Sequence, residues 1–291
     1  MRIPHLPALA AAALVAATAT ASPPSPVVPA HVPPARVAPA DPGAPGPLAV
    51  VEHEVGAHDV RLRGLARPVE FRAHIEEPSP APGSPRRPVV VFLHGAHLTC
   101  YRPGATEGDE THHRPCRAPE REVPNHLGYR WIQRILASQG YFTISVSANV
   151  VNDQEVVSVE GTSARGELVR RHLTALPAST RRRIDLRRVV VVGHSRGGEG
   201  AANAAATTPS SGPVRVVGFV AVGATNFGMA GVPHVPMVAV LPYCDGDVAA
   251  LEGQRTIERG RDLVPGDSAF RSAGGDGRRQ PQLLQHRVDP R

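Results

Sequence analysis

Four short apolar runs predict the buried strands of the chain. They occupy residues 88–95, 141–148, 214–223 and 236–247. Continuous apolar runs of this length are typical of strands that are covered on both faces of a parallel sheet. A fifth run, Val189–Val192, leads directly into a glycine-containing turn. The pattern therefore predicts a parallel sheet at the centre of the chain.

The remaining segments follow other periods. Residues 129–140 and 163–176 each place apolar residues on one helical face, and a more polar helix is expected from about Ala249 to Leu263. Residues 58–64 and 68–77 alternate polar and apolar positions, as a half-exposed antiparallel hairpin does. Strands that alternate with helices predict an α/β chain with a doubly wound, mostly parallel sheet and an antiparallel N-terminal hairpin.

The fifth apolar run continues as Gly193-His194-Ser195-Arg196-Gly197 and then as an Ala-rich, helix-favouring segment. A Gly-x-Ser-x-Gly turn between a strand and a helix is the nucleophile elbow, which holds a serine hydroxyl above the sheet. Ser195 is therefore the predicted nucleophile, and a merely structural turn is the alternative. The elbow and the antiparallel start together predict an α/β-hydrolase fold.

Backbone amides near Ser195 are the expected oxyanion hole, which needs N–H donors aimed at a developing negative oxygen. Arg196 supplies one of them as the residue after the nucleophile. The second is expected from the loop after residues 88–95, where Ala96 and His97 are the candidates. His94 is interpreted as a hydrogen-bonded loop histidine and not as the general base.

The acid of a Ser-His-acid triad follows the serine in this fold, and the histidine follows the acid. Asp245 lies at the end of the run 236–247 and is preferred, with Asp247 as the alternative. Of the 14 histidines, only His286 comes after Asp245. It lies in a polar tail rich in Arg and Gln, with no apolar strand to deliver it, so His286 is not expected to be the base and the catalytic histidine is unassigned.

Several segments resemble a group of secreted bacterial α/β-hydrolases that are related to lipases, polyester-cleaving esterases and dienelactone hydrolases. The resemblance rests on "VFLHGAHLTCY", "SQGYFTISVSAN", "GHSRGGEG" and "LPYCDGDV" and covers roughly residues 50–272. It implies a serine esterase that acts on carboxylic esters. In such proteins a final strand leads into an Asn-His-Asn segment that supplies the catalytic histidine, and this chain departs from that pattern after about Ala273.

A frameshift would explain the departure. Permitted codons for Gly274 onward, translated one base later, give Val-Val-Met-Gly-Ala-Ala-Asn-His-Asn-Phe-Phe. This is an apolar strand followed by Asn-His-Asn, with the histidine at the position of Pro281. We therefore predict that residues 273–291 are an aberrant tail and that the last strand of the sheet is missing. A genuinely divergent tail is the alternative.

The N-terminal residues predict export. A short basic head, an apolar run over Leu6–Thr18 and small residues before Ser22 predict a signal peptide over 1–21 that leaves no membrane span once it is cleaved. Residues 22–47, rich in Pro and Ala, are expected to be a disordered linker before a hydrolase domain at 48–272. The predicted location is extracellular.

Three cysteines in an exported chain allow one disulfide. Cys100 and Cys116 bracket a polar loop and are the expected pair, which leaves Cys244 over.

Charge and loop composition argue against several other classes of function. All 32 basic residues are Arg, and the net charge is +6, but aromatic residues do not interleave with the Arg181–Arg183 cluster, so no nucleic-acid binding is expected. The polar side chains Asp109, Glu110, His112, His113 and His126 are interpreted as exposed loop residues and not as a metal site. No cofactor is expected. The short connection at residues 223–235 predicts an open site for bulky or polymeric esters, and the oligomeric state is left open.

Overall fold

The computed structural model describes residues 41–104, 113–154, 158–242 and 245–276. Contacts divide the chain into two units, Met1–Pro42 and Gly43–Arg291, and the described helices and strands all belong to the second. The expected signal peptide, most of the expected linker, and Cys244 and His286 lie outside the described residues.

The described part of the second unit is mixed α/β. In chain order its elements are β1 (Val50–Val60), β2 (Val69–Pro78), β3 (Arg87–Leu93), β4 (Cys100–Tyr101), β5 (Arg121–Glu122), the 3-10 helix η1 (Asn125–Leu127), α1 (Arg130–Ser138), β6 (Phe142–Val146), α2 (Asn149–Gln154), α3 (Val159–Ala175), α4 (Ala178–Arg183), β7 (Ile184–His194), α5 (Arg196–Thr207), β8 (Val216–Val222), β9 (Met237–Pro242), α6 (Glu252–Leu263) and β10 (Arg271–Asp276).

The central sheet has eight strands in the order β1-β2-β6-β3-β7-β8-β9-β10. β2 pairs antiparallel with both β1 and β6, and the pairs from β6 to β10 are all parallel. The predicted mostly parallel sheet with an antiparallel start is therefore confirmed. Because parallel strands place their carboxyl ends at one edge, the chain leaves β3, β7, β8, β9 and β10 on the same side of the molecule.

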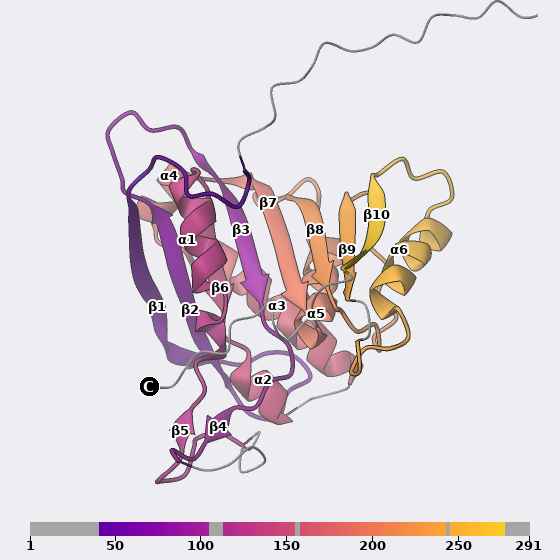
Figure 1. The fold of residues 1–291 in the computed structure, drawn as a ribbon, viewed down its shortest axis with the longest axis horizontal. Helices are drawn as coiled ribbons and strands as arrows, with labels where there is room; N and C mark the ends of the chain where they lie inside the picture. Colours follow the sequence, from indigo (N-terminus) through magenta and orange to yellow (C-terminus); the bar gives the residue numbers. More distant parts are fainter. Residues whose placement is uncertain (1–40, 105–112, 155–157, 243–244, 277–291) are drawn as a thin grey trace, which may run out of the picture. The chain divides into compact units, whose positions relative to one another are not determined.

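Helices cover both faces of the sheet, with α1 on one face and α3 and α5 on the other (Figure 1). Side chains of β3 point alternately to the two faces of the sheet. Val89, Val91 and Leu93 belong to the large core that also contains residues of α3 and α5. Val90 and Phe92 form a smaller cluster with Tyr129 and partly buried residues of α1. A strand buried on both faces needs apolar side chains at every position, which is why this segment is a continuous apolar run.

The prediction that the last strand is missing is wrong in the described structure. Residues Arg271–Asp276 form β10, which pairs in parallel with β9 from Arg271 opposite Met237 to Asp276 opposite Pro242. Its sequence, RSAGGD, has no apolar alternation, so the strand rests on backbone pairing with β9. The first four residues of the expected aberrant tail thus belong to the sheet, and residues 277–291 lie outside the description.

The N-terminal boundary of the domain lies slightly before residue 48. The backbone N–H of Gly46 donates to Ser138 Oγ at 2.7 Å, and Gln139 Nε2 donates to the Ala44 carbonyl at 2.8 Å. The last residues of the expected linker therefore pack on the end of α1.

The predicted disulfide between Cys100 and Cys116 is confirmed. Cys100 also belongs to the two-stranded β4–β5 hairpin, in which it pairs with Glu122 beyond the bridged loop. The hairpin lies beyond the carboxyl ends of β3 and β6 (Figure 1). Among the described residues, no helix has both the length and the apolar character needed to span a membrane.

Candidate functional site

Ser195 occupies the turn between β7 and α5, as the sequence predicts. Its backbone has φ 51° and ψ −128°, an unusual conformation for a residue with a side chain. Such strained backbone persists only where surrounding structure holds it and is concentrated at functional sites. The backbone N–H of Ser195 donates to Val222 of β8, and its carbonyl accepts from Gly198 and Thr225. Three main-chain hydrogen bonds therefore hold the turn.

Glycines make this turn sterically feasible. A Cβ on Gly193 would lie 2.2 Å from the Gly197 carbonyl oxygen, and one on Gly197 would lie 2.2 Å from the Leu93 carbonyl oxygen. Both contacts are with backbone atoms, which can move only at a large cost in free energy. The flanking glycines of the motif thus let β7, α5 and the end of β3 meet closely beneath Ser195.

The loop that follows β3 lies against the nucleophile. A Cβ on Gly95 would lie 2.7 Å from Ser195 Cβ and 3.3 Å from Ser195 Oγ. Ala96 and His97, the expected second oxyanion donors, come next in the chain and are half-buried. The loop is therefore close enough to Ser195 for one of these amides to share a ligand with the serine.

Arg196 is the first residue of α5, so its backbone N–H has no acceptor within the helix. The positive end of the helix dipole adds to the attraction of this position for a negative oxygen. Arg196 follows Ser195 in the chain, and the Ala96–His97 loop follows Gly95, which packs against Ser195.

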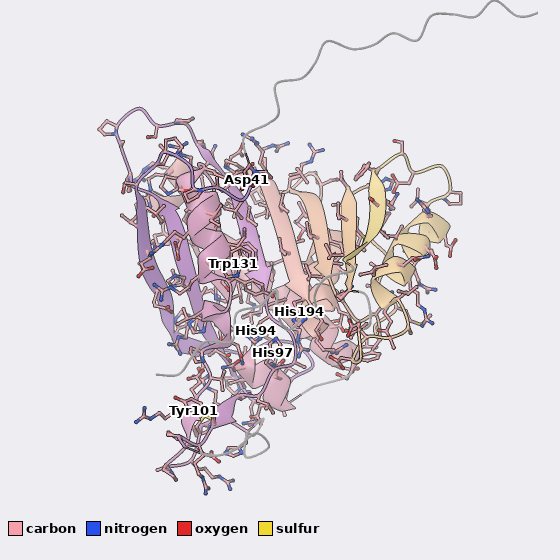
Figure 2. The ribbon with its side chains drawn as sticks, viewed as in Figure 1. Asp41, His94, His97, Tyr101, Trp131 and His194 are labelled. Carbon is pink, nitrogen blue, oxygen red and sulfur yellow. A yellow bond between two sulfur atoms is a disulfide. The ribbon has the colours of Figure 1, made fainter. Side chains whose placement is uncertain are left out.

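Three histidines gather at this edge of the sheet: His94, His97 and His194 (Figure 2). The rings of His97 and His194 stack with centroids 5.4 Å apart, and the rings of His94 and His97 are 6.1 Å apart. His94 is fully buried, its Nε2 accepts from the Ala148 N–H at 2.9 Å, and burial holds the pKa of His94 well below its usual value. A neutral imidazole whose Nε2 is already bonded to a backbone amide has the role of an anchor, as predicted for His94.

Asp245 follows β9 on the same edge. Its Oδ1 accepts from the backbone N–H groups of Asp247 and Val248, each at 3.0 Å. Its Oδ2 is buried and has no hydrogen-bond partner in the described part of the chain. The alternative acid, Asp247, is exposed and contributes a backbone N–H to Asp245. The geometry thus favours Asp245, because its buried Oδ2 can accept a further hydrogen bond.

A small pocket adjoins Asp245 and is lined on its other sides by Gly223 and Ala224 after β8 and by Leu241 and Pro242 of β9. Ala224 also packs against the elbow helix, since a Cβ on Gly198 would lie 2.3 Å from Ala224 Cβ. The pocket therefore lies between the acid loop and the elbow.

The catalytic histidine is not found among the described residues at this pocket. β10 ends at Asp276, opposite Pro242, so the chain leaves the sheet at the edge that carries Ser195 and Asp245. His286 and the position of Pro281 both follow this exit and lie outside the described residues.

Sequence reasoning missed a buried network behind the elbow. Arg196 and Glu199 form an ion pair with both side chains almost fully buried. Glu199 also accepts from Thr162 Oγ1 and, at 2.6 Å, from the backbone N–H of Phe227, while Arg196 donates to the Ser158 carbonyl at 2.9 Å. The network joins α5 to the start of α3 and to the loop after β8. The three-residue spacing of Arg196 and Glu199 on one helix is the only sequence signal for it.

Of the loop residues considered for a metal site, the structure describes His113 and His126, which contact different carboxylates. Asp109, Glu110 and His112 lie outside the described residues, and His113 bonds to Glu120 at 2.9 Å. The interpretation of His126 as an exposed loop residue is wrong, because it is fully buried in η1 and lies 3.3 Å from Glu54.

Glu52, His74 and Glu76 come close enough together for metal ligation on β1 and β2. Arg134 forms ion pairs with Glu52 and Glu76, and Arg130 forms one with Glu52. The acidic groups are therefore already neutralised by arginines.

No family model matches the chain, and no curated protein is significantly similar to it.

Proposed function

We propose that the chain is a serine hydrolase of the α/β-hydrolase type that acts on carboxylic esters through an acyl-enzyme on Ser195. The observation that carries the proposal is the strained backbone of Ser195 at the end of a central parallel strand. A nucleophile elbow requires this conformation, and a merely structural turn would gain nothing from a serine there. The antiparallel pairing of β2 in an otherwise parallel sheet supports the same fold.

The reaction follows from the positions of these groups. Ser195 Oγ attacks the ester carbonyl carbon and gives its proton to a base. The carbonyl oxygen becomes negative and accepts from Arg196 N–H and from an amide of the Ala96–His97 loop. The bond to the alcohol then breaks, the alcohol leaves with the proton, and water releases the acid by the same steps.

Asp245 is the proposed acid that orients the base. Its Oδ2 is buried beside the small pocket between the acid loop and the elbow and has no partner among the residues that the structure describes. A buried carboxylate oxygen without a partner costs stability, and an imidazole N–H would satisfy it. We propose that this histidine belongs to the frame-shifted version of the tail, five residues past Asp276 at position 281.

The substrate proposed is an apolar ester that is bulky or polymeric. The connection from β8 to β9 is short, and it leaves Phe227 and Met229 exposed by 49% and 61%. Exposed apolar side chains near a reactive serine favour a substrate that brings apolar surface of its own.

A catalytically inactive binding module with a hydrolase fold is the second candidate. It is favoured by the absence, in the described part of the chain, of a histidine bonded to Asp245. Labelling of Ser195 by a fluorophosphonate separates the two, because the reaction needs an activated hydroxyl. The proposed enzyme requires labelling in the chain with the shifted frame restored from Gly274. A restored chain that folds but remains unlabelled would support the binding module.

We also propose that the protein is exported. The Cys100–Cys116 disulfide suits an oxidising compartment. Mass spectrometry of the exported protein should find Ser22 as the first residue, and an exported form that still begins with Met1 would contradict the predicted cleavage.

A further inference from the structure

Asn152 of α2 lies beneath the loop that follows β3. Its Nδ2 donates to the Gly95 carbonyl at 3.0 Å and to the His97 carbonyl at 3.2 Å. Its Oδ1 accepts from Arg165 Nη2 of α3 at 2.5 Å. Asn152 and Arg165 are both fully buried. One amide side chain thus ties the loop beside the nucleophile to the core of the domain.

The chemistry of the partners fixes which way this amide faces. Arginine has only donors, so the side-chain atom of Asn152 that meets Arg165 must be the oxygen. The NH₂ group is then left to face the two carbonyls, which only accept. The orientation of Asn152 therefore follows from its neighbours and has no flipped alternative of equal energy.

This contact determines the direction of a neighbouring N–H. In a trans peptide the C=O and N–H groups point to opposite sides. Because the Gly95 carbonyl is held toward Asn152, the N–H of Ala96 in the same peptide points away from it. Gly95 packs directly against Ser195, since a Cβ on Gly95 would lie 2.7 Å from Ser195 Cβ and 3.3 Å from Ser195 Oγ.

We propose that Asn152, held by Arg165, is the positioning residue that turns the Gly95–Ala96 peptide so that the Ala96 N–H serves as the second oxyanion donor. The inference rests on the proposed hydrolase function and selects Ala96 over His97. Asn152 does not touch the substrate and acts only through the peptide that it holds.

Two variants test this role in the full chain. Asn152→Ala removes all three hydrogen bonds. Asn152→Asp keeps an acceptor for Arg165 but has no donor for the Gly95 and His97 carbonyls. It therefore preserves the buried contact with Arg165 and removes the two hydrogen bonds to the loop. Asn203→Ala is the control, because Asn203 is on α5 and its oxygen meets Arg170.

Crystal structures of the variants give a readout that needs no activity. We expect the Gly95–Ala96 peptide to rotate or lose its single orientation in both Asn152 variants and to stay unchanged in Asn203→Ala. An unchanged peptide in Asn152→Ala and Asn152→Asp would overturn the proposal, whatever the chain does to esters.

Phenylboronic acid tests the oxyanion hole without turnover. Ser195 Oγ forms a bond to boron, the serine proton is released to solvent, and the tetrahedral boronate adduct is an anion in which a boron-bound hydroxyl takes the place of the intermediate's negative oxygen. We expect binding that Ser195→Ala abolishes and that both Asn152 variants weaken at least about tenfold, since one oxyanion donor is worth about 10²–10³ in kcat. Equal affinity in the Asn152 variants and the parent would overturn the positioning role.

The chain with the restored frame adds a kinetic readout. Asn152→Asp should lower kcat by about 10²-fold and leave KM nearly unchanged, because the donor acts on the transition state. A rise in KM alone would contradict the role. If no Ser195-dependent adduct forms in any chain, the proposed hydrolase function fails, while the crystal structures still decide whether Asn152 sets the peptide.

Discussion

The nucleophile end and the acid end of the sheet differ in how closely the chain packs around the candidate residues. At the elbow, Ser195 is 9% exposed, and the nearest backbone would lie 2.2 Å from a Cβ on Gly193. At the other end, a Cβ on Gly246 or Gly274 would meet nothing within 4 Å. The edge strand β10 exposes Ser272, Ala273 and Gly274.

Among the described residues, the elbow is held more closely than the acid end. The elbow is held by hydrogen bonds, close glycine contacts and a buried ion pair that leave it one conformation. At the acid end, among the described residues, a buried carboxylate oxygen has no hydrogen-bond partner and β10 is exposed. The proposed frame shift predicts this second pattern, because the residues that it alters are those proposed to cover β10 and bond to Asp245.

Substituting the two acids should give the largest effect. In the chain with the restored frame, Asp245→Asn should lower kcat by about 10⁴-fold, as expected when a triad histidine loses the carboxylate that orients it. Asp247→Asn, two residues away and exposed, should change kcat by less than about tenfold. Ester hydrolysis by the two variants measures the difference. Equal losses of kcat would contradict the assignment of Asp245 as the acid of the triad.

Glycine substitutions compare the packing of the two ends directly. Gly193→Ala should lower the free energy of unfolding by about 3 kcal/mol or more, because the new Cβ meets backbone that cannot move cheaply. Gly274→Ala in β10 should change it by no more than about 0.5 kcal/mol. Urea unfolding of both variants gives the values, and a large loss from Gly274→Ala would mean that the acid end is as closely packed as the elbow.

Acid should destabilise the domain through His172 of α3, which is buried and stacks on Phe71 with ring centroids 3.9 Å apart. Burial lowers the pKa of His172 from 6.5 to about 4. The unfolded chain then binds a proton that the folded chain does not, so stability falls as the pH drops from about 6.5 to about 4. The loss is at most about 3 kcal/mol.

Urea unfolding as a function of pH checks this prediction. The His172→Gln variant should lose stability less steeply than the parent over this range, while a variant at the exposed His53 should follow the parent. A parent and a His172→Gln variant with parallel pH profiles would exclude His172 as the cause.

The sequence predicts the parts of this molecule that local chemistry determines. The elbow follows from glycine spacing, β2 from alternation, and the Cys100–Cys116 bridge from the loop that it closes. The predicted first hairpin strand lies too late in the chain, because β1 covers Val50–Val60 and only its end overlaps the predicted 58–64. β10 could not be predicted, because RSAGGD carries no strand pattern and pairs only through backbone. The burial of His126 and the contacts of Asn152 and Arg165 were also not predicted, because polar residues become buried only where distant segments supply their hydrogen-bond partners.

Ester hydrolysis by two versions of the chain tests the central claim most directly. The 291-residue chain should hydrolyse short p-nitrophenyl esters barely or not at all, since a lost triad member costs about 10⁶-fold in kcat. Restoring the shifted frame from about Gly274 should produce esterase activity that Ser195→Ala abolishes and that falls below about pH 6 to 7, where a histidine base becomes protonated. The account would be contradicted by full activity of the unaltered chain together with its loss in His286→Ala, because His286 would then be the base.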